Sequence, residues 1–248
     1  YMKKIKTYLY SLTDPSPLII FRIIFGLSML FSMIRFWYNG WIDTVYIDPD
    51  FHFKYYGFEW VRSFEEYNYL LFIICILTSL FVILGYKYTF SITVFFLSFT
   101  YIELIDKTTY LNHYYFISVV SFILIFLPAN CKFSLDSYFQ NRSCQKIPKW
   151  NIDILKLMLF IVYFYSGIAK INSDWLFKAI PLTIWLPGKY DLPLIGSFMS
   201  EIWVHYLMSW CGMFYDLLIG FFLFSRLYKS YAYIFVIIFH VLTAIFFP

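Results

Sequence analysis

One lysine is placed where it could do acid–base chemistry at the edge of a membrane. Lys170 ends a long apolar run, and Tyr163 and Gly167 precede it by seven and three residues. This spacing places all three residues on one face of a helix. Apolar surroundings disfavour the protonated form of an amine, and a neutral amine is a usable general base. The alternative interpretation is a lysine whose stem lies along apolar surface while its charged end reaches the outer interface.

Two histidines and one aspartate are further candidates for chemistry. His113 follows Asn112 at the start of an apolar run, shortly after Asp106, and histidine can donate or accept a proton near neutrality. His240 and Asp216 each lie within an apolar run, where ionisable groups are costly and often functional. Each also has an ordinary explanation, which is a hydrogen bond between helices or, for His113, a helix cap.

The sequence indicates no metal or nucleotide site. A structural zinc site needs clustered ligands, whereas the four histidines are scattered, at His52, His113, His205 and His240. The four cysteines form no C-x-x-C pair, and nothing specifies a pair of haem ligands. No glycine-rich phosphate loop or nucleophile elbow is present. The net charge of +4 is small, and the basic residues form no stripe, so nucleic-acid binding is also excluded.

The elements that must position these residues are membrane helices. Of 248 residues, 61% are hydrophobic and 14% charged, against about 25% charged in soluble domains. Seven apolar stretches approach the roughly 20 residues that span a bilayer, at about 18–38, 68–85, 88–105, 112–129, 153–170, 202–224 and 230–247. We therefore predict an all-α integral membrane protein with about seven transmembrane helices, forming a single domain over 1–248.

The distribution of lysine and arginine predicts the orientation, because these residues stay on the cytoplasmic side. They gather in the N-terminal segment and in every second connection, at Lys3, Lys4, Lys6, Lys87, Lys132, Arg142, Lys146, Lys149, Arg226 and Lys229. A cytoplasmic N-terminus follows, with Lys170, His113 and the chain end at Pro248 toward the outside. Arg22 and Arg35, near opposite ends of the first helix, are expected to reach the two interfaces.

Several motifs, in order, resemble the vitamin K-dependent γ-glutamyl carboxylases and their bacterial relatives, which share a horizontally transferred transmembrane (HTTM) domain. The similar segments are DKTTYLNHYY at 106–115, FLPAN at 126–130, FSLD at 133–136, VYFYSGIAKINSDW at 162–175, DLLIG at 216–220, FH at 239–240 and FFP at 246–248. The first loop, through YYGFEW at 55–60, is similar to that of the bacterial members. The resemblance runs nearly from end to end.

The resemblance implies a role for each candidate residue. Lys170 occupies the place of the lysine that the family uses as its base. His113 occupies the place of a histidine that assists carboxylation, with Asn112 beside it, and His240 matches a histidine in a later helix. Together with Tyr163 on the face of Lys170, this gives Lys170 and His113 as catalytic residues, and Asn112, His240 and Tyr163 as cofactor-binding residues.

The family reaction implies the cofactors and partners. An amine deprotonates reduced vitamin K or a related quinol, whose anion reacts with O₂ and rearranges to a strong alkoxide base. That base removes a γ-proton from glutamate, the carbanion attacks CO₂, and the quinone leaves as its epoxide. Because water quenches the alkoxide, the site must be dry. The resemblance thus implies a carbon–carbon lyase in the bacterial inner membrane among lipids, with its site facing the periplasm and a glutamate-containing peptide or protein as substrate.

Departures from the family support an alternative. The carboxylases continue into further helices and a large outer-face domain that helps to bind the peptide, and we expect that domain to be absent from 1–248. Ala169 stands where animal enzymes have a second basic residue. The alternative is a non-catalytic membrane scaffold, or a lipid- or quinone-binding subunit with membrane or periplasmic partner subunits. A retinal-binding photoreceptor with its imine on Lys170 is a third and weaker interpretation.

Overall fold

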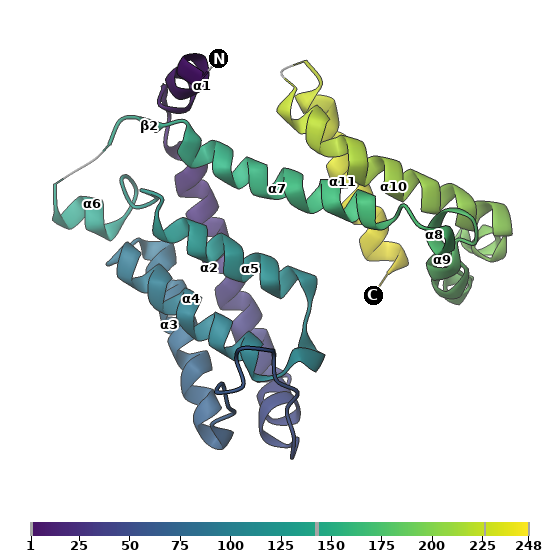
Figure 1. Ribbon diagram of the computed structural model, residues 1–248, viewed down its shortest axis with the longest axis horizontal. Coiled ribbons are helices and arrows are strands. Elements are labelled where there is room, and N and C mark those ends of the chain that lie inside the picture. Colours follow the sequence, from purple (N-terminus) through teal and green to yellow (C-terminus); the bar gives the residue numbers. More distant parts are fainter. Residues whose placement is uncertain (1, 142–143, 226, 248) are drawn as a thin grey trace. The chain divides into compact units, whose positions relative to one another are not determined.

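The computed structural model is a chain of helices joined by short connections (Figure 1). It describes residues 2–141, 144–225 and 227–247. Three residues used in the sequence-based predictions, Arg142, Arg226 and Pro248, lie outside these described residues.

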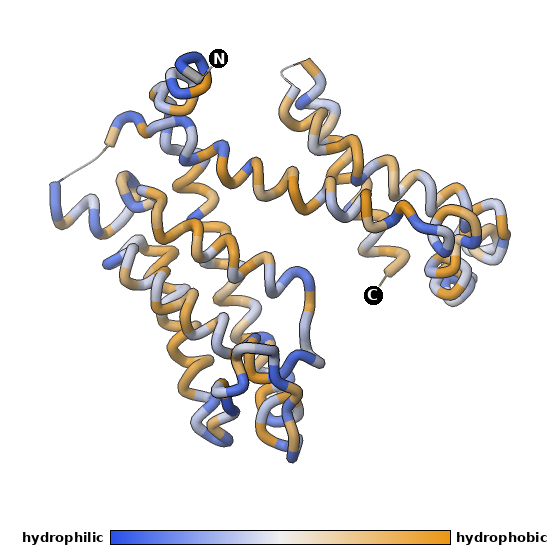
Figure 2. Tube along the Cα trace, viewed as in Figure 1, coloured by the Kyte–Doolittle hydropathy of each residue, from blue (hydrophilic) through white to orange (hydrophobic). Residues whose placement is uncertain are grey.

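Six helices of the described chain are long and apolar enough to cross a membrane. They are α2 (Ser16–Tyr38), α3 (Asn68–Leu84, a span of Glu65–Leu84 with the turn before it), α4 (Tyr88–Ile105), α7 (Trp150–Ala169), α10 (Ile202–Phe224) and α11 (Lys229–Phe246). Figure 2 shows hydrophobic residues along the length of these helices. The all-α membrane fold is therefore confirmed.

The remaining predicted span, at about 112–129, is shorter than expected. Helix α5 (Asn112–Ile125) has 14 residues, or about 21 Å at 1.5 Å per residue, which is less than the roughly 30 Å of a hydrocarbon core. It ends three residues before Pro128, a residue type that cannot continue a helix. The described chain thus has six full-length spans and one short apolar helix, rather than seven equal spans.

Short elements join the spans. The helical ones are α1 (Met2–Leu9), η1 (Asp43–Ile47), η2 (Glu65–Tyr67), η3 (Lys107–Thr109), α6 (Leu135–Phe139), α8 (Ser173–Leu176), α9 (Ile180–Trp185), η4 (Leu186–Lys189) and η5 (Gly196–Ser200). Within the described ranges, the sheet consists of one antiparallel pair, in which β1 (Leu12–Thr13) bonds to β2 (Ile147–Pro148).

The chain divides into two compact units, Tyr1–Leu155 and Lys156–Pro248, which are described separately. In the first unit, α2 packs on α3, α3 on α4 and α4 on α5 (Figure 1). Phe25 of α2 meets Phe95 of α4 edge to face, with their ring centroids 5.9 Å apart, as is favoured for aromatic pairs. In the second unit, α10 packs on α11 and on the short helices α8 and α9.

A buried arginine joins the start of α2 to the connection that follows α5. Arg22 of α2 is 0% exposed, so the expectation that it reaches an interface is wrong. Its Nη1 and Nη2 donate to the carbonyls of Ala129, at 3.2 Å, and Phe133, at 2.6 Å. These acceptors belong to the connection after α5, which folds back over the end of α2. Arg35 is exposed, and its guanidinium lies 5.5 Å from the centre of the Trp41 ring.

The turn between α3 and α4 is built against this arginine. Gly85 ends α3 with φ of 62°, in the left-handed region that glycine adopts readily. The carboxylate of Asp136 accepts hydrogen bonds from the backbone N–H groups of Lys87, at 2.7 Å, and Tyr88, at 2.9 Å. The FLPAN and FSLD segments therefore have a structural function. Their carbonyls accept the hydrogen bonds of Arg22, and Asp136 caps the start of α4.

Replacing Gly85 with alanine is expected to reduce stability by at least about 2 kcal/mol. The left-handed backbone costs a side chain about 1–2 kcal/mol, and an added Cβ would lie 2.3 Å from Arg22 Nη1 and 2.4 Å from Ser134 Cβ. Gly40 has a similar φ of 67° with nothing within 4 Å, so Gly40→Ala measures the backbone term alone. Thermal unfolding in detergent should show the larger loss for Gly85→Ala. Equal losses would contradict the role of crowding.

A disulfide closes the same connection. Cys131 and Cys144 are bonded, with their Cα atoms 5.3 Å apart, and the Cys144 N–H donates to the Cys131 carbonyl at 3.1 Å. Cys75 and Cys211 are free. The two bonded cysteines share one loop, but their spacing in the sequence did not predict the bond.

Candidate functional site

Lys170 lies in an ion pair at the end of α7. Its Nζ donates to Asp216 Oδ2 at 2.5 Å and to Ser166 Oγ at 2.8 Å, and Ser166 Oγ donates to the same Asp216 oxygen at 2.8 Å. The side chains of Lys170 and Asp216 are 20% and 6% exposed. Lys170 is therefore mostly buried and held by a charge-assisted hydrogen bond, which is stronger than a bond between neutral groups.

Two glycines let the helices that carry this pair approach closely. A Cβ on Gly167 of α7 would lie 2.7 Å from Leu217 Cγ and 2.8 Å from Leu217 N on α10. A Cβ on Gly220 of α10 would lie 2.6 Å from a ring carbon of Phe160 on α7. Small residues at a crossing are typical of membrane helices. The reciprocal glycines thus bring Asp216 within reach of Lys170.

A tryptophan covers the ion pair from the connection after α7. Asn172 caps α8 by accepting from the Trp175 N–H at 2.9 Å. The indole Nε1 of Trp175 donates to the Ser209 carbonyl at 2.7 Å, and Ser209 Oγ donates to the Trp175 carbonyl at 2.6 Å. The Lys170 ammonium lies 5.2 Å from the centre of the Trp175 ring, within the range of a cation–π contact. The INSDW segment thus fixes the environment of the lysine.

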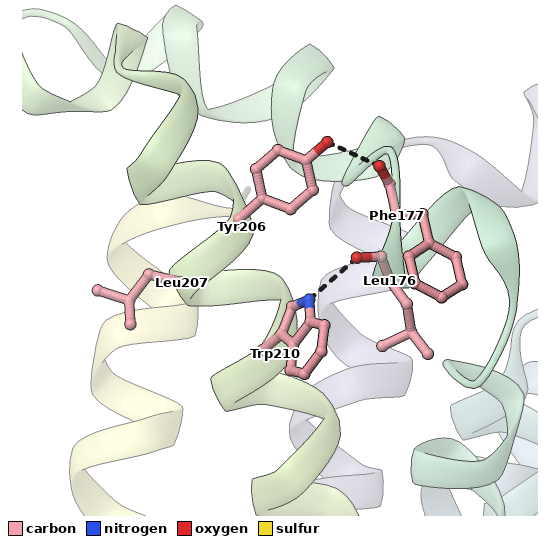
Figure 3. Close-up of a pocket in the computed structure, with 5 residues that line it drawn as sticks. All are labelled: Leu176, Phe177, Tyr206, Leu207 and Trp210. Carbon is pink, nitrogen blue, oxygen red and sulfur yellow. Dashed lines mark hydrogen bonds between the residues drawn. The ribbon is translucent and has the colours of Figure 1, made fainter.

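An apolar groove lies beside this covering turn (Figure 3). It has a volume of about 470 Å³ and is lined by Leu176, Phe177, Tyr206, Leu207 and Trp210. The Tyr206 hydroxyl donates to the Phe177 carbonyl at 2.7 Å, and the Trp210 indole donates to the Leu176 carbonyl at 2.9 Å. Because both polar ends are bonded to backbone, the groove offers mainly hydrocarbon and aromatic surface.

Tyr163 and His240, both predicted to bind cofactor, meet in the second unit. His240 Nδ1 lies 2.8 Å from the Val236 carbonyl, which can only accept, so Nδ1 carries a proton. In a neutral ring, Nε2 is then the acceptor, and the Tyr163 hydroxyl donates to it over 3.5 Å. The structure therefore brings together two residues that lie 77 positions apart.

Asn112 and His113 lie in the other unit, at the start of α5. Both are exposed, and the His113 ring centre is 4.6 Å from that of Tyr114. Because His113 and Lys170 belong to different units, a site shared between them stays a prediction.

The segment that leads to His113 is clamped to the first loop. Asp106 Oδ1 accepts from the N–H and hydroxyl of Thr108, both at 2.8 Å, and Asp106 Oδ2 lies 3.1 Å from His52 Nδ1. Lys54 Nζ donates to the Ile105 carbonyl at 2.9 Å. Burial alone would raise the pKa of Asp106, but the hydrogen bonds from Thr108 and His52 outweigh it and lower the pKa.

Asp106→Asn is expected to loosen this clamp at neutral pH, whereas in the parent protein the clamp should weaken only in acid. A lowered folded pKa adds stability that is complete above the unfolded pKa of about 3.9 and disappears as the pH falls through the folded value. Hydrogen exchange of residues 52–54 and 106–109 measures the clamp. Asp174→Asn, at an exposed pair with Lys178, is the control. Unchanged exchange in Asp106→Asn would contradict the clamp.

Comparison with known families adds one match. The HTTM domain family matches residues 10–248. The chain belongs to the HTTM domain family. The matched region includes Lys170, Asp216, Tyr163, His240 and His113, so the membership predicted from the motifs is confirmed. No solved structure matches the chain.

Some parts of this HTTM chain's site were missing from the sequence-based prediction. The sequence indicates Asp216 as an ionisable residue in an apolar run, but it does not identify Lys170 as its partner. It also does not indicate Ser166 as a hydrogen-bond partner of Lys170. The signal for Ser166 was local, because it precedes Lys170 by one helical turn. Among the described residues of this HTTM protein, no group of three or more His, Cys, Asp or Glu could hold a metal ion.

Proposed function

We propose that this HTTM protein is a quinone-dependent membrane enzyme of the γ-glutamyl carboxylase and epoxidase type, with Lys170 as the base for reduced vitamin K or a related quinol. The main support is the cluster of Lys170, Ser166 and Asp216 at the crossing of two membrane helices. Ionisable groups in such positions are costly and are commonly retained for function.

The ion pair suggests how the lysine could become a base. Nζ must lose one proton before it can accept the proton of a quinol hydroxyl. Asp216 Oδ2, at 2.5 Å, can take that proton, and Ser166 bonds to both groups. The products are a neutral amine and a neutral acid. The pair therefore exchanges a proton internally without changing its net charge.

The residues near the lysine suit a lipophilic quinone. The Tyr163 hydroxyl and the His240 imidazole lie beside each other, with Oη and Nε2 3.5 Å apart, and both can hydrogen-bond to a quinone oxygen. The groove beside Trp175 is apolar. When bound, the quinol together with O₂ and CO₂ supplies the carboxylation chemistry. The residues of the chain bind and orient it, limit the access of water and hold the proton on Lys170 or Asp216.

The remaining parts of the proposal follow the family resemblance. His113 and Asn112 assist at the outer end of the first unit, and a glutamate-containing peptide or protein is the carboxyl acceptor. The protein lies in a bacterial inner membrane, and its site faces the periplasm.

The groove also favours a second candidate function, that of a lipid- or quinone-binding scaffold without catalysis. Tyr206 and Trp210 bond to backbone with their polar atoms, so the surface they present can hold a hydrocarbon chain without any chemistry. Such a scaffold would act through membrane or periplasmic partner subunits.

One assay separates the two functions. Purified protein is incubated with reduced vitamin K and O₂, and the epoxide is measured by mass spectrometry. The enzyme produces epoxide in proportion to protein. A scaffold produces none, and its partner subunits remain bound during purification in detergent.

A further inference from the structure

Part of the first loop lies against the side of a membrane span. The segment 58–64, between α2 and α3, runs beside Tyr101 of α4. The Tyr101 hydroxyl donates to the Arg62 carbonyl at 3.0 Å and accepts from the Arg62 N–H at 3.3 Å. The Phe64 ring stacks on the Tyr101 ring with their centres 5.4 Å apart, and the centre of the Trp60 ring lies 6.4 Å from that of Tyr101. The segment is therefore attached to the span by both its backbone and its rings.

The contact with Tyr101 gives the depth of this segment along the span. Helix α4 has 18 residues, or about 27 Å at 1.5 Å per residue, which is close to the roughly 30 Å of a hydrocarbon core. The ends of α4 therefore lie near the two boundaries of that core. Tyr101 precedes the end of α4 at Ile105 by about one helical turn. Trp60 and Phe64, beside Tyr101, thus lie where the hydrocarbon meets the headgroups.

The rings of this segment present apolar surface at that level. Trp60 and Phe64 are 66% and 49% exposed. Below them on α4, Phe90 and Leu97 are also exposed, and their spacing from Tyr101 places all three on one face of the helix. An exposed apolar face on a membrane span is covered by lipid, which acts as its solvent. The rings of Trp60 and Phe64 continue this lipid-facing surface toward the end of the span.

The backbone of the segment is also suited to a position at membrane depth. Irregular backbone that leaves water needs hydrogen-bond partners within the protein. The Val61 N–H donates to the Phe58 carbonyl at 3.0 Å, and the Phe64 N–H donates to Asn68 Oδ1 at 3.1 Å, in addition to the two bonds of Arg62 with Tyr101. The Val61 side chain is fully buried. The segment thus has partners for these donors without water.

We propose that residues 58–64 form an interfacial anchor, whose Trp60 and Phe64 rings lie among the phospholipids of the bilayer that the spans cross. Tryptophan is enriched at this level because its ring is apolar and its N–H can bond to polar headgroups. The exposed side chain of Arg62 lies between the two rings in the sequence and can reach lipid phosphate. The anchor fixes the level in the membrane of the end of α4, where the clamp at Asp106 begins. It is independent of the quinone chemistry.

The emission of Trp60 in lipid tests the anchor. The purified full chain and Trp60→Phe are placed in phosphatidylcholine vesicles, and the difference between their spectra isolates Trp60 among the eight tryptophans. Bromine on the acyl chains quenches tryptophan that touches lipid, whereas iodide quenches tryptophan that touches water. The Trp60 spectrum should lose most of its intensity in brominated vesicles and little with iodide. Trp41→Phe is the matched control from the same loop, because Arg35 lies against the Trp41 ring and the Trp41 spectrum should lose less to brominated lipid.

A second variant tests the attachment to the span. Tyr101→Phe removes the hydroxyl that bonds to Arg62 and keeps the ring, so Trp60 should lose less emission to brominated lipid and more to iodide. Unchanged quenching in Tyr101→Phe means that this contact does not set the depth, and it overturns the inference. In the parent protein, a Trp60 spectrum that iodide quenches and brominated lipid does not also overturns it, since the segment then lies in water. Quenching by neither reagent means that protein, such as a second copy of the chain, covers the ring instead of lipid.

Discussion

Lys170→Ala is expected to reduce epoxide formation from reduced vitamin K by about 10²–10⁴-fold, the usual contribution of a positioned general base. The amine that would accept the quinol proton is removed, whereas Tyr163 and His240 remain to bind the ring. Binding of menadione, an oxidised quinone, should therefore change little while turnover is lost. Mass spectrometry of the epoxide and fluorescence quenching by menadione measure the two effects on one preparation.

Lys170→Arg separates the base from the charge. A guanidinium keeps a positive partner for Asp216, but it cannot be deprotonated under these conditions. This variant should fold like the parent protein and yet form no epoxide. Turnover at the parent rate in Lys170→Arg would exclude Lys170 as the base, and the scaffold function would then be favoured.

Asp216→Ala is expected to lower the free energy of unfolding by about 2–3 kcal/mol, because it leaves an ammonium without its carboxylate. Breaking a fully buried pair costs about 3–5 kcal/mol, and we expect less here because the Lys170 side chain is 20% exposed and so partly screened by solvent. Thermal unfolding in detergent measures the loss. Asp174→Ala, which breaks the exposed pair with Lys178, should cost less than about 0.5 kcal/mol.

A double variant tests whether the pair serves function rather than stability. Replacing a buried ion pair with apolar residues of similar volume is often neutral or stabilising. Lys170→Met with Asp216→Leu should therefore recover most of the stability that Asp216→Ala loses, while turnover stays absent. A double variant that is less stable than Asp216→Ala would show that the pair is needed for folding, which would weaken the argument for proton exchange.

The spans were predictable because bilayer thickness fixes the length of an apolar helix. The predicted stretch 202–224 coincides with α10, and 88–105 coincides with α4. Helix α5 was overestimated because the apolar run continues to Ala129 although the helix ends at Ile125. The burial of Arg22 could not be predicted, because its acceptor carbonyls lie 107 and 111 positions away in the sequence. No local sequence pattern indicates such distant partners.

The candidate site, like the fold, could be predicted from the sequence only in part. The shared face of Tyr163 and Lys170 follows from helical periodicity, and the sequence motifs identified the lysine. The partner of Lys170 lies 46 positions away on α10, and the two meet at a crossing of helices that two glycines allow, which no local sequence pattern indicates.

The bond between Cys131 and Cys144 can serve as a natural marker of membrane topology. It lies just before α7 begins at Trp150, whereas Lys170 follows the other end of that helix, so a spanning α7 puts the two on opposite sides of the bilayer. Thiols stay reduced in the cytosol, and disulfides persist in the periplasm. In intact cells, free thiols at this pair would place Lys170 in the periplasm. An oxidised pair, which is the state in the structure, would place Lys170 on the cytosolic side, opposite to the orientation that the lysines and arginines predict.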